Sequence, residues 1–283
     1  MGEGDLSDAN GLLNMATFLA ILLGTITGSF LSNHLPIACA ILVLASGLGL
    51  AASFGIQALP AAKPREALLW NPFRDLVANW VLIRQDRALR LGTVAVNYFW
   101  LMGAILQLNI FLYAKEMMNA TPQISGFLLV AVALGIGIGS VLAGKLSRGH
   151  VEVGLVPLGG LGMGLFAIDL LFAYHSLWRV LIDFFMMGFS GGFYDIPLAA
   201  LIQWRSPAGE RGRVLATVNF FSFMAILAGS IVLWVLGSML HLNPAQIFFT
   251  LGLLSVIGLS VACFCLPETF EHIGRYFRSQ RPV

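Results

Sequence analysis

Long apolar runs separated by short polar segments divide this sequence. A helix needs about 20 consecutive apolar residues to cross the hydrocarbon of a membrane. The runs predict eight transmembrane helices, at residues 11–32, 36–59, 91–113, 124–145, 154–174, 178–202, 213–240 and 245–266. The links after the first, fifth and seventh of these helices are very short, so we expect each to join a tight antiparallel pair.

Lysine and arginine gather on one side of this arrangement. Of the 16 basic residues, all but Lys115 and Arg179 fall in the segments that share one face of the membrane. Basic residues collect on the cytoplasmic side of membrane proteins. The pattern therefore predicts that both termini and the long link at 60–90 are cytoplasmic.

The link at 60–90 alternates aromatic and basic residues, which is typical of an amphipathic helix lying in the membrane interface. Asn71-Pro72 makes a favourable start for such a helix. A solvated linker between two domains is the alternative. The residues in question are Trp70, Phe73, Trp80, Arg74, Arg84 and Arg87.

Composition supports an all-α, polytopic membrane protein. Hydrophobic residues make up 58% of the chain, charged residues 11%, and the mean hydropathy is +0.85. The net charge is only +2 without a basic stripe, which argues against nucleic acid as a partner. Cys39, Cys263 and Cys265 lie in apolar runs with no histidine in register, so we expect no metal site. With no Ser/His/Asp set and no acyltransferase motif, we expect neither enzymatic activity nor a cofactor.

An internal repeat relates the first predicted helix to the seventh. A shift of 205 positions aligns Asn14, Phe18, Ala20, Ile21, Leu22 and Gly24 with Asn219, Phe223, Ala225, Ile226, Leu227 and Gly229. The spacing of six helices makes residues 91–266 a complete six-helix unit and residues 1–59 the last two helices of a preceding unit. The remaining parts are the link at 60–90 and a cytoplasmic tail at 267–283.

Parallel six-helix repeats joined by a long cytoplasmic link resemble the major facilitator superfamily. By this resemblance the eight helices correspond to helices five to twelve of a twelve-helix fold, and we expect the chain to be truncated at its amino terminus. Several stretches are also similar to bacterial lysophospholipid transporters, a branch of that superfamily. They are Ala9-Asn10-Gly11-Leu12, Asn71-Pro72-Phe73, Phe99-Trp100-Leu101-Met102-Gly103, Ile196-Pro197-Leu198 and Arg205-Ser206-Pro207.

The resemblance implies a secondary transporter that moves lysophospholipid across the bacterial inner membrane for reacylation. Its expected partners are membrane lipids and an acyltransferase, since the same domain heads fusions with a phospholipid acyltransferase and an acyl-carrier-protein synthetase. Two alternatives stay open: a generic drug or metabolite exporter, and a membrane anchor for a neighbouring or fused enzyme. One residue departs from the branch, Asp195, where we expect an apolar side chain.

The resemblance also implies that the helices at 91–113 and 178–202 line a central cavity. Polar side chains inside a bilayer rarely face lipid. The candidate substrate-binding residues are therefore Asn97, Tyr98, Trp100, Gln107 and Asp195. For each of them, a hydrogen bond between helices is the competing interpretation.

A second set of residues is expected to act in structure or gating. Arg179 and Asp183 lie one helical turn apart, at a depth similar to that of Asp169, which predicts an Asp/Arg/Asp cluster. Glycine pairs at four-residue spacing allow close helix contact, and in this superfamily helices five and eight meet at the seam between the halves; chance is the alternative explanation. The glycine pairs are Gly24 with Gly28 and Gly135 with Gly139, and the repeated Asn14 and Asn219 complete the set.

Overall fold

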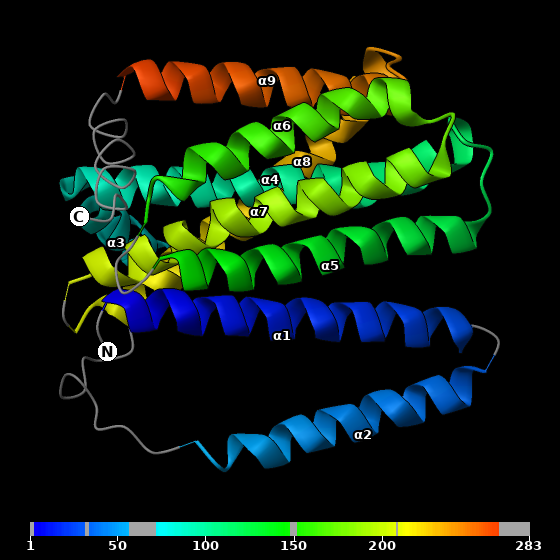
Figure 1. The fold of residues 1–283 in the computed structure, drawn as a ribbon. Coiled ribbons are helices and arrows are strands. Elements are labelled where there is room, and N and C mark those ends of the chain that lie inside the picture. The colour runs from blue at the N-terminus through cyan, green and yellow to red at the C-terminus, as the bar shows by residue number, and fades with distance from the viewer. Residues whose placement is uncertain (1–2, 32–33, 57–71, 148–151, 208, 266–283) are drawn as a thin grey trace, which may run out of the picture.

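A computed structural model describes residues 3–31, 34–56, 72–147, 152–207 and 209–265. These residues form α-helices, one π-helical turn and no strand (Figure 1). The helices are α1 (Glu3–Phe30), α2 (Leu35–Ser53), α3 (Pro72–Gln85), α4 (Arg87–Glu116), α5 (Pro122–Leu146), α6 (Leu155–Ala173), α7 (Leu177–Arg205), α8 (Arg211–Trp234), η1 (Val235–Met239) and α9 (Pro244–Cys265). The end of the bundle that carries α3 is called the inner end, and the end that carries His175 the outer end.

Each predicted span coincides with a helix, and α8 continues through η1. Six helices of the described chain are long and apolar enough to cross a membrane: α2, α4, α5, α6, α7 and α8 with η1. In α1 and α9 the described apolar stretches are shorter, Ala9–Ile21 and Pro244–Ser260. The crossing of the membrane by all eight helices therefore stays a prediction.

The amphipathic helix predicted in the link is α3, which begins at Pro72. Its Ile83 is fully buried, and the Trp80 ring meets that of Phe221 on α8 edge to face, with centroids 5.2 Å apart. These contacts hold α3 against the inner ends of α4 and α8. Trp70 lies outside the described residues, and the position of α3 in a membrane interface stays a prediction.

Helices α4 to α9 pack into one bundle, with α7 between α5 and α6 (Figure 1). Helix α1 lies alongside α5 and also contacts α7. Helix α2 stands apart, and none of its residues is buried. The expected tight pair of the first two helices is thus wrong in its packing: the helices run antiparallel but do not pack along their length. Contact with lipid is about as favourable for an apolar helix as contact with a second apolar helix. The apolar sequence of α2 therefore does not favour its burial.

The outer half of the core centres on three aromatic rings from three helices. Tyr113 of α4, Phe184 of α7 and Phe248 of α9 meet edge to face at centroid distances of 5.6–5.9 Å. The buried hydroxyl of Tyr113 donates a hydrogen bond to the carbonyl of Leu170 on α6 at 2.7 Å. Four helices are therefore joined at this level.

Glycine brings α5 and α7 into backbone contact. A Cβ atom added at Gly135 or Gly139 would lie under 3.0 Å from backbone atoms of Phe185 or Phe189 on α7. The expectation that this glycine pair meets α1 at a seam is wrong. Gly24 of α1 has nothing within 4 Å of an added Cβ, and the surroundings of Gly28 and the side chain of Asn14 lie outside the described part.

The contact between α1 and α5 uses a different glycine. A Cβ added at Gly11 would lie 2.9 Å from the carbonyl oxygen of Ser140 on α5. Helix α5 carries glycine on more than one face. Gly135 and Gly139 face α7, and Gly137, which lies between them in the sequence, is on another side of the helix. Spacing alone therefore cannot tell which glycine meets which neighbour.

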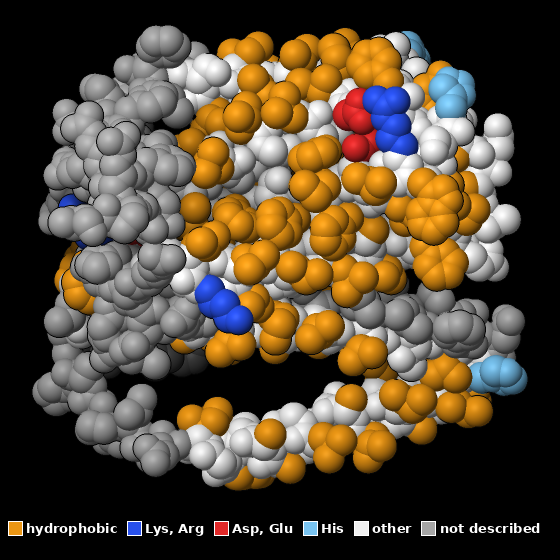
Figure 2. All heavy atoms as spheres, viewed as in Figure 1, with side chains coloured by type: hydrophobic (Ala, Val, Ile, Leu, Met, Phe, Trp, Pro, Cys, Tyr) orange, Lys and Arg blue, Asp and Glu red, His pale blue; other side chains and the backbone are white. Residues whose placement is uncertain are grey.

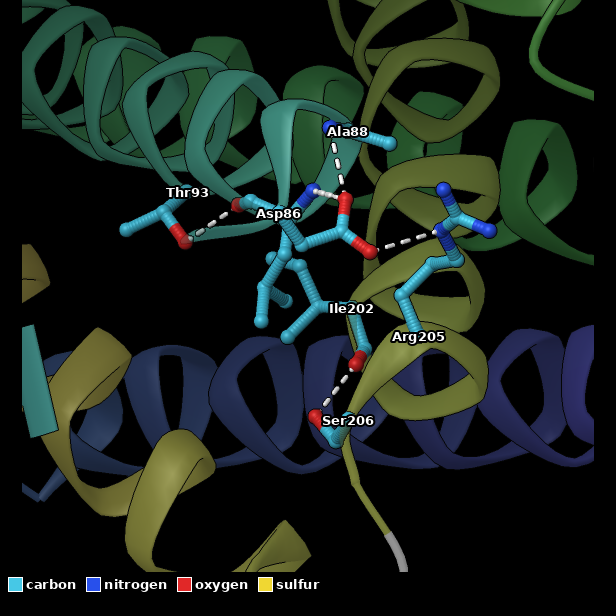
Figure 3. A network of polar contacts seen from close by, with 7 residues as sticks. Asp86, Ala88, Thr93, Ile202, Arg205 and Ser206 are labelled. Carbon is cyan, nitrogen blue, oxygen red and sulfur yellow. Dashed lines mark hydrogen bonds and ion pairs between the residues drawn. The ribbon is translucent and has the colours of Figure 1, made fainter. Parts of the chain in front are cut away.

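Polar contacts tie α7 to α4 and α1 at the inner end. Asp86 caps α4 by accepting hydrogen bonds from the amides of Ala88 and Leu89 at 2.8 and 3.1 Å (Figure 3). Its other carboxylate oxygen lies 3.2 Å from Arg205 Nε on α7. Such a cap is worth about 1 kcal/mol, and a half-exposed ion pair adds up to about 1 kcal/mol. On the other side of α7, Gln203 Nε2 donates to Asn10 Oδ1 of α1 at 2.8 Å.

Candidate functional site

A partly open cavity of about 470 Å³ lies between α4, α5 and α7, with α1 and α8 at its sides. Helices α4 and α7 correspond to the spans at 91–113 and 178–202, which the family resemblance implied as cavity helices. The volume lies in the range of about 300–1,000 Å³ that small-molecule sites occupy. The lining includes Ile21 from α1, Phe99, Trp100, Gly103 and Gln107 from α4, Val130, Ala133 and Ile136 from α5, Met187, Gly191 and Asp195 from α7, and Ile226 from α8.

The wall of the cavity is apolar except at four residues. These are Thr17, Gln107, Asp195 and Ser230, and Asp195 is the one charged residue among the described lining residues. At 1.5 Å per residue, Gln107 lies about 14 Å from the outer end of α4 and Asp195 about 15 Å from the inner end of α7. An apolar wall with polar groups at two depths suits an amphipathic molecule.

Three lining residues of α4 share one helical face. Trp100, Gly103 and Gln107 follow one another at spacings of three and four residues, which places them in a row along the cavity. Sequence reasoning named Trp100 and Gln107 but missed Gly103. The same spacing could have found it, because Gly103 stands between the other two in that row.

Asn97 and Tyr98 lie at helix contacts and are not among the lining residues. Asn97 Nδ2 donates to the Thr93 carbonyl at 2.8 Å, and Asn97 Oδ1 accepts from Ser222 Oγ on α8 at 3.1 Å. The hydroxyl of Tyr98 is hydrogen-bonded to Ser255 Oγ on α9. This geometry agrees with the competing interpretation, in which these residues join helices.

Asp195 is buried in α7, with 8% of the residue exposed. Pro197 follows two residues later inside the helix. Proline has no amide hydrogen, so one backbone hydrogen bond of the helix is lost close to Asp195. Sequence reasoning placed this carboxyl group on a cavity helix, and the structure places it on the cavity wall.

The predicted Asp/Arg/Asp cluster forms between α6 and α7 at the outer end. Arg179 donates two hydrogen bonds to Asp169, from Nε to Oδ2 at 3.0 Å and from Nη2 to Oδ1 at 2.5 Å. Asp183 is only 3% exposed and lies next to this pair. None of the three lines the cavity. Figure 2 shows acidic and basic side chains side by side, with hydrophobic side chains around them.

Two further predictions concern residues away from the cavity. Asn219 is exposed on α8, and the structure gives it no contact with the cavity. Within the described ranges, no group of three or more His, Cys, Asp or Glu side chains could hold a metal ion.

The chain matches the family model of the Major Facilitator Superfamily over residues 2–230. The lysophospholipid transporter LplT of Photorhabdus laumondii is 30% identical over 230 residues, which cover 77% of this chain and 54% of that protein. LplT of Pectobacterium carotovorum is 29% identical over 252 residues, covering 81% and 60%. LplT of Escherichia coli K12 is 30% identical over 232 residues, covering 78% and 56%.

The chain thus spans about half the length of the curated relatives that it matches. These relatives are named as transporters and not as enzymes, and their family consists of multi-pass membrane proteins. The match covers more than three quarters of this sequence. On this evidence, the chain belongs to the Major Facilitator Superfamily of membrane transporters.

Proposed function

We propose that the chain contributes eight helices to a twelve-helix transporter that moves lysophospholipid across the bacterial inner membrane. The eight helices correspond to helices five to twelve. Residues 1–59 supply the last two helices of the first half, residues 60–90 the cytoplasmic link, and residues 91–266 the second half, followed by the tail at 267–283. An acyltransferase, fused or separate, then restores the second acyl chain of the transported lipid.

The internal repeat supports this architecture. Ile21 of α1 and Ile226 of α8 occupy equivalent positions in the repeat, and both line the same cavity. In a transporter built from two parallel six-helix units, equivalent helices approach a central site from opposite sides. Helix α1 lies on α5, which supports the proposal that α1 belongs to the first half and meets the second half there.

The proposal of a lipid substrate rests on the apolar lining of the cavity. A lysophospholipid has one acyl chain and one polar headgroup, which match an apolar wall with a few polar groups, among them Gln107 and Asp195. Relatives about 30% identical are named as lysophospholipid transporters. A generic drug or metabolite exporter stays the alternative. If its substrate were a polar solute, it would need more polar groups on this wall than the described lining supplies.

The orientation of the chain is testable by cysteine labelling. We propose that both termini and α3 face the cytoplasm, because the basic residues gather at that end. A membrane-impermeant thiol reagent added outside intact cells is expected to label single cysteines introduced beside Lys115 or His241. It is expected to miss cysteines beside Arg84. The opposite labelling pattern would overturn this orientation.

Lipid uptake tests the function itself. In cells that lack their own lysophospholipid transporter, a form with four further helices before Met1 is expected to restore uptake and reacylation of added lysophosphatidylethanolamine. The chain of 283 residues alone is expected to restore none, because rocking transport needs two helical bundles around one site. Equal activity of the two forms would contradict the twelve-helix proposal. A well-expressed extended form that moves no lysolipid would favour the generic exporter.

Asp195→Asn is expected to lower uptake by the extended form at least about threefold, which corresponds to about 0.7 kcal/mol. The reason is the loss of the one charged group on the described cavity wall. Glu116→Gln is the matched control, because it makes the same acid-to-amide change at the exposed end of α4. Equal uptake by both variants would remove Asp195 from the substrate path.

A further inference from the structure

The Asp169, Arg179 and Asp183 cluster stands apart from the cavity and is not used by the proposed transport path. Arg179 and Asp169 form a two-point ion pair, and their side chains are 51% and 35% exposed. Asp183 lies deeper, at 3% exposure, and its Oδ2 atom has no hydrogen-bond partner. The cluster therefore combines a half-exposed ion pair with a buried carboxyl group that the pair does not satisfy.

The charges in the cluster balance only if one carboxyl group carries a proton. The guanidinium of Arg179 stays protonated in proteins and neutralises one carboxylate, that of Asp169. An ionised Asp183 would add a second negative charge at a buried position, which is strongly unfavourable without its own partner. Two carboxyl groups beside each other relieve this repulsion by sharing one proton.

The contact between the two carboxyl groups supports the same conclusion. The carboxyl groups of Asp183 on α7 and Asp169 on α6 lie next to each other. Ionised carboxylates are acceptors only, so a hydrogen bond between two of them requires a proton on one. Asp183 is the group that carries it, because both oxygens of Asp169 already accept hydrogen bonds from Arg179.

The other groups that face Asp183 offer no second positive charge. From α4 comes Tyr113, whose hydroxyl donates to the Leu170 carbonyl and is thus already used. From α6 come Asp169 and, at its end, Tyr174, followed by the exposed His175, whose ring is tilted against that of Tyr174 with centroids 4.0 Å apart. The outer-end turns of α5 and α9, at 122–128 and 244–250, contain no titratable residue.

We propose that this cluster is a proton-binding site, in which Asp183 carries the proton and donates it in a hydrogen bond to Asp169. When the proton leaves to water, the two carboxylates share the one guanidinium of Arg179. That exchange needs no helix movement, because Arg179 lies one turn from Asp183 on the same helix. The half-exposed Arg179 and Asp169 provide the route to the outer aqueous phase, and the substrate cavity is not on that route.

Infrared difference spectroscopy of the purified full chain tests the site. Near neutral pH, the spectrum of the wild type minus that of Asp183→Asn is expected to contain the C=O stretching band of a protonated carboxylic acid. The band should move to lower frequency in D2O. Wild type minus Glu116→Gln is the matched control. Apart from the bands of the new side-chain amide, it should contain carboxylate bands and no protonated-acid band. If the spectrum of the wild type minus that of Asp183→Asn likewise contained carboxylate bands and no protonated-acid band, the proposal would be overturned.

A second variant keeps the test decisive if Asp183→Asn does not fold. Arg179→Gln removes the balancing charge, but Asp183 already carries its proton, so we expect the protonated-acid band to be as intense in the variant as in the wild type. If Asp183 were instead an ordinary ionised partner of Arg179, the band would be absent from the wild type and appear only in Arg179→Gln. The readout does not depend on transport, so it is separate from the test of the proposed function.

Discussion

Replacing Gly139 by alanine is expected to destabilise the protein by roughly 1–3 kcal/mol, the usual cost of forcing extra atoms into a packed core. The added Cβ would lie under 3.0 Å from backbone atoms of Phe189 on α7. A backbone segment inside a helix cannot move aside as a flexible side chain can. Helices α5 and α7 must therefore separate, and the contacts on either side of Gly139 weaken. Thermal melting in detergent should show a lower melting temperature.

Two glycines of α5 supply matched controls. At Gly137 an added Cβ meets only Cγ of the Met15 side chain, at 3.9 Å, and at Gly126 it meets nothing within 4 Å. Gly137→Ala and Gly126→Ala should therefore melt at or above the temperature of the wild type, because alanine favours helix more than glycine does. Gly188→Ala on the facing helix should behave like Gly139→Ala. If all four variants melted alike, the backbone contact between α5 and α7 would be refuted.

The helices themselves were predictable because a membrane span needs a long apolar run. Turn residues and basic residues between the runs set their limits, and α3 begins at the predicted Pro72. The ion pair of Asp169 with Arg179 was also predictable, because charged groups at similar depth in an apolar bundle have few other partners. Both predictions depend on local sequence and on general costs of burial.

The partners of individual helix faces were not predictable from one sequence. In lipid, apolar side chains gain little by facing another helix, so hydropathy does not mark the packed face. Gly135 and Gly139 could therefore be identified as a close-contact pair but not assigned to α7. For the same reason the sequence could not distinguish Asn97 and Tyr98 from Gln107, since all three are polar residues within one span. In the structure Asn97 and Tyr98 form hydrogen bonds with α8 and α9, whereas Gln107 lines the cavity.

The largest effect on transport is expected from a bulky residue at Gly103. This residue lines the cavity at the middle of the row formed by Trp100 and Gln107, and an added Cβ meets nothing within 4 Å. A tryptophan at this position would have space at its Cβ and would place its indole in the path of the substrate. We expect Gly103→Trp to lower lysophosphatidylethanolamine uptake by the extended form at least about tenfold, or about 1.4 kcal/mol.

Two controls separate blockage of the cavity from damage to the fold. Gly103→Ala adds a single methyl group in open space and should retain uptake. Gly258→Trp places the same indole on an exposed part of α9 that lines no cavity and also has nothing within 4 Å of an added Cβ, so it too should retain uptake. All three variants should melt near the wild-type temperature, because none adds an atom against backbone. Wild-type uptake by a correctly folded Gly103→Trp would show that the substrate does not pass between α4, α5 and α7.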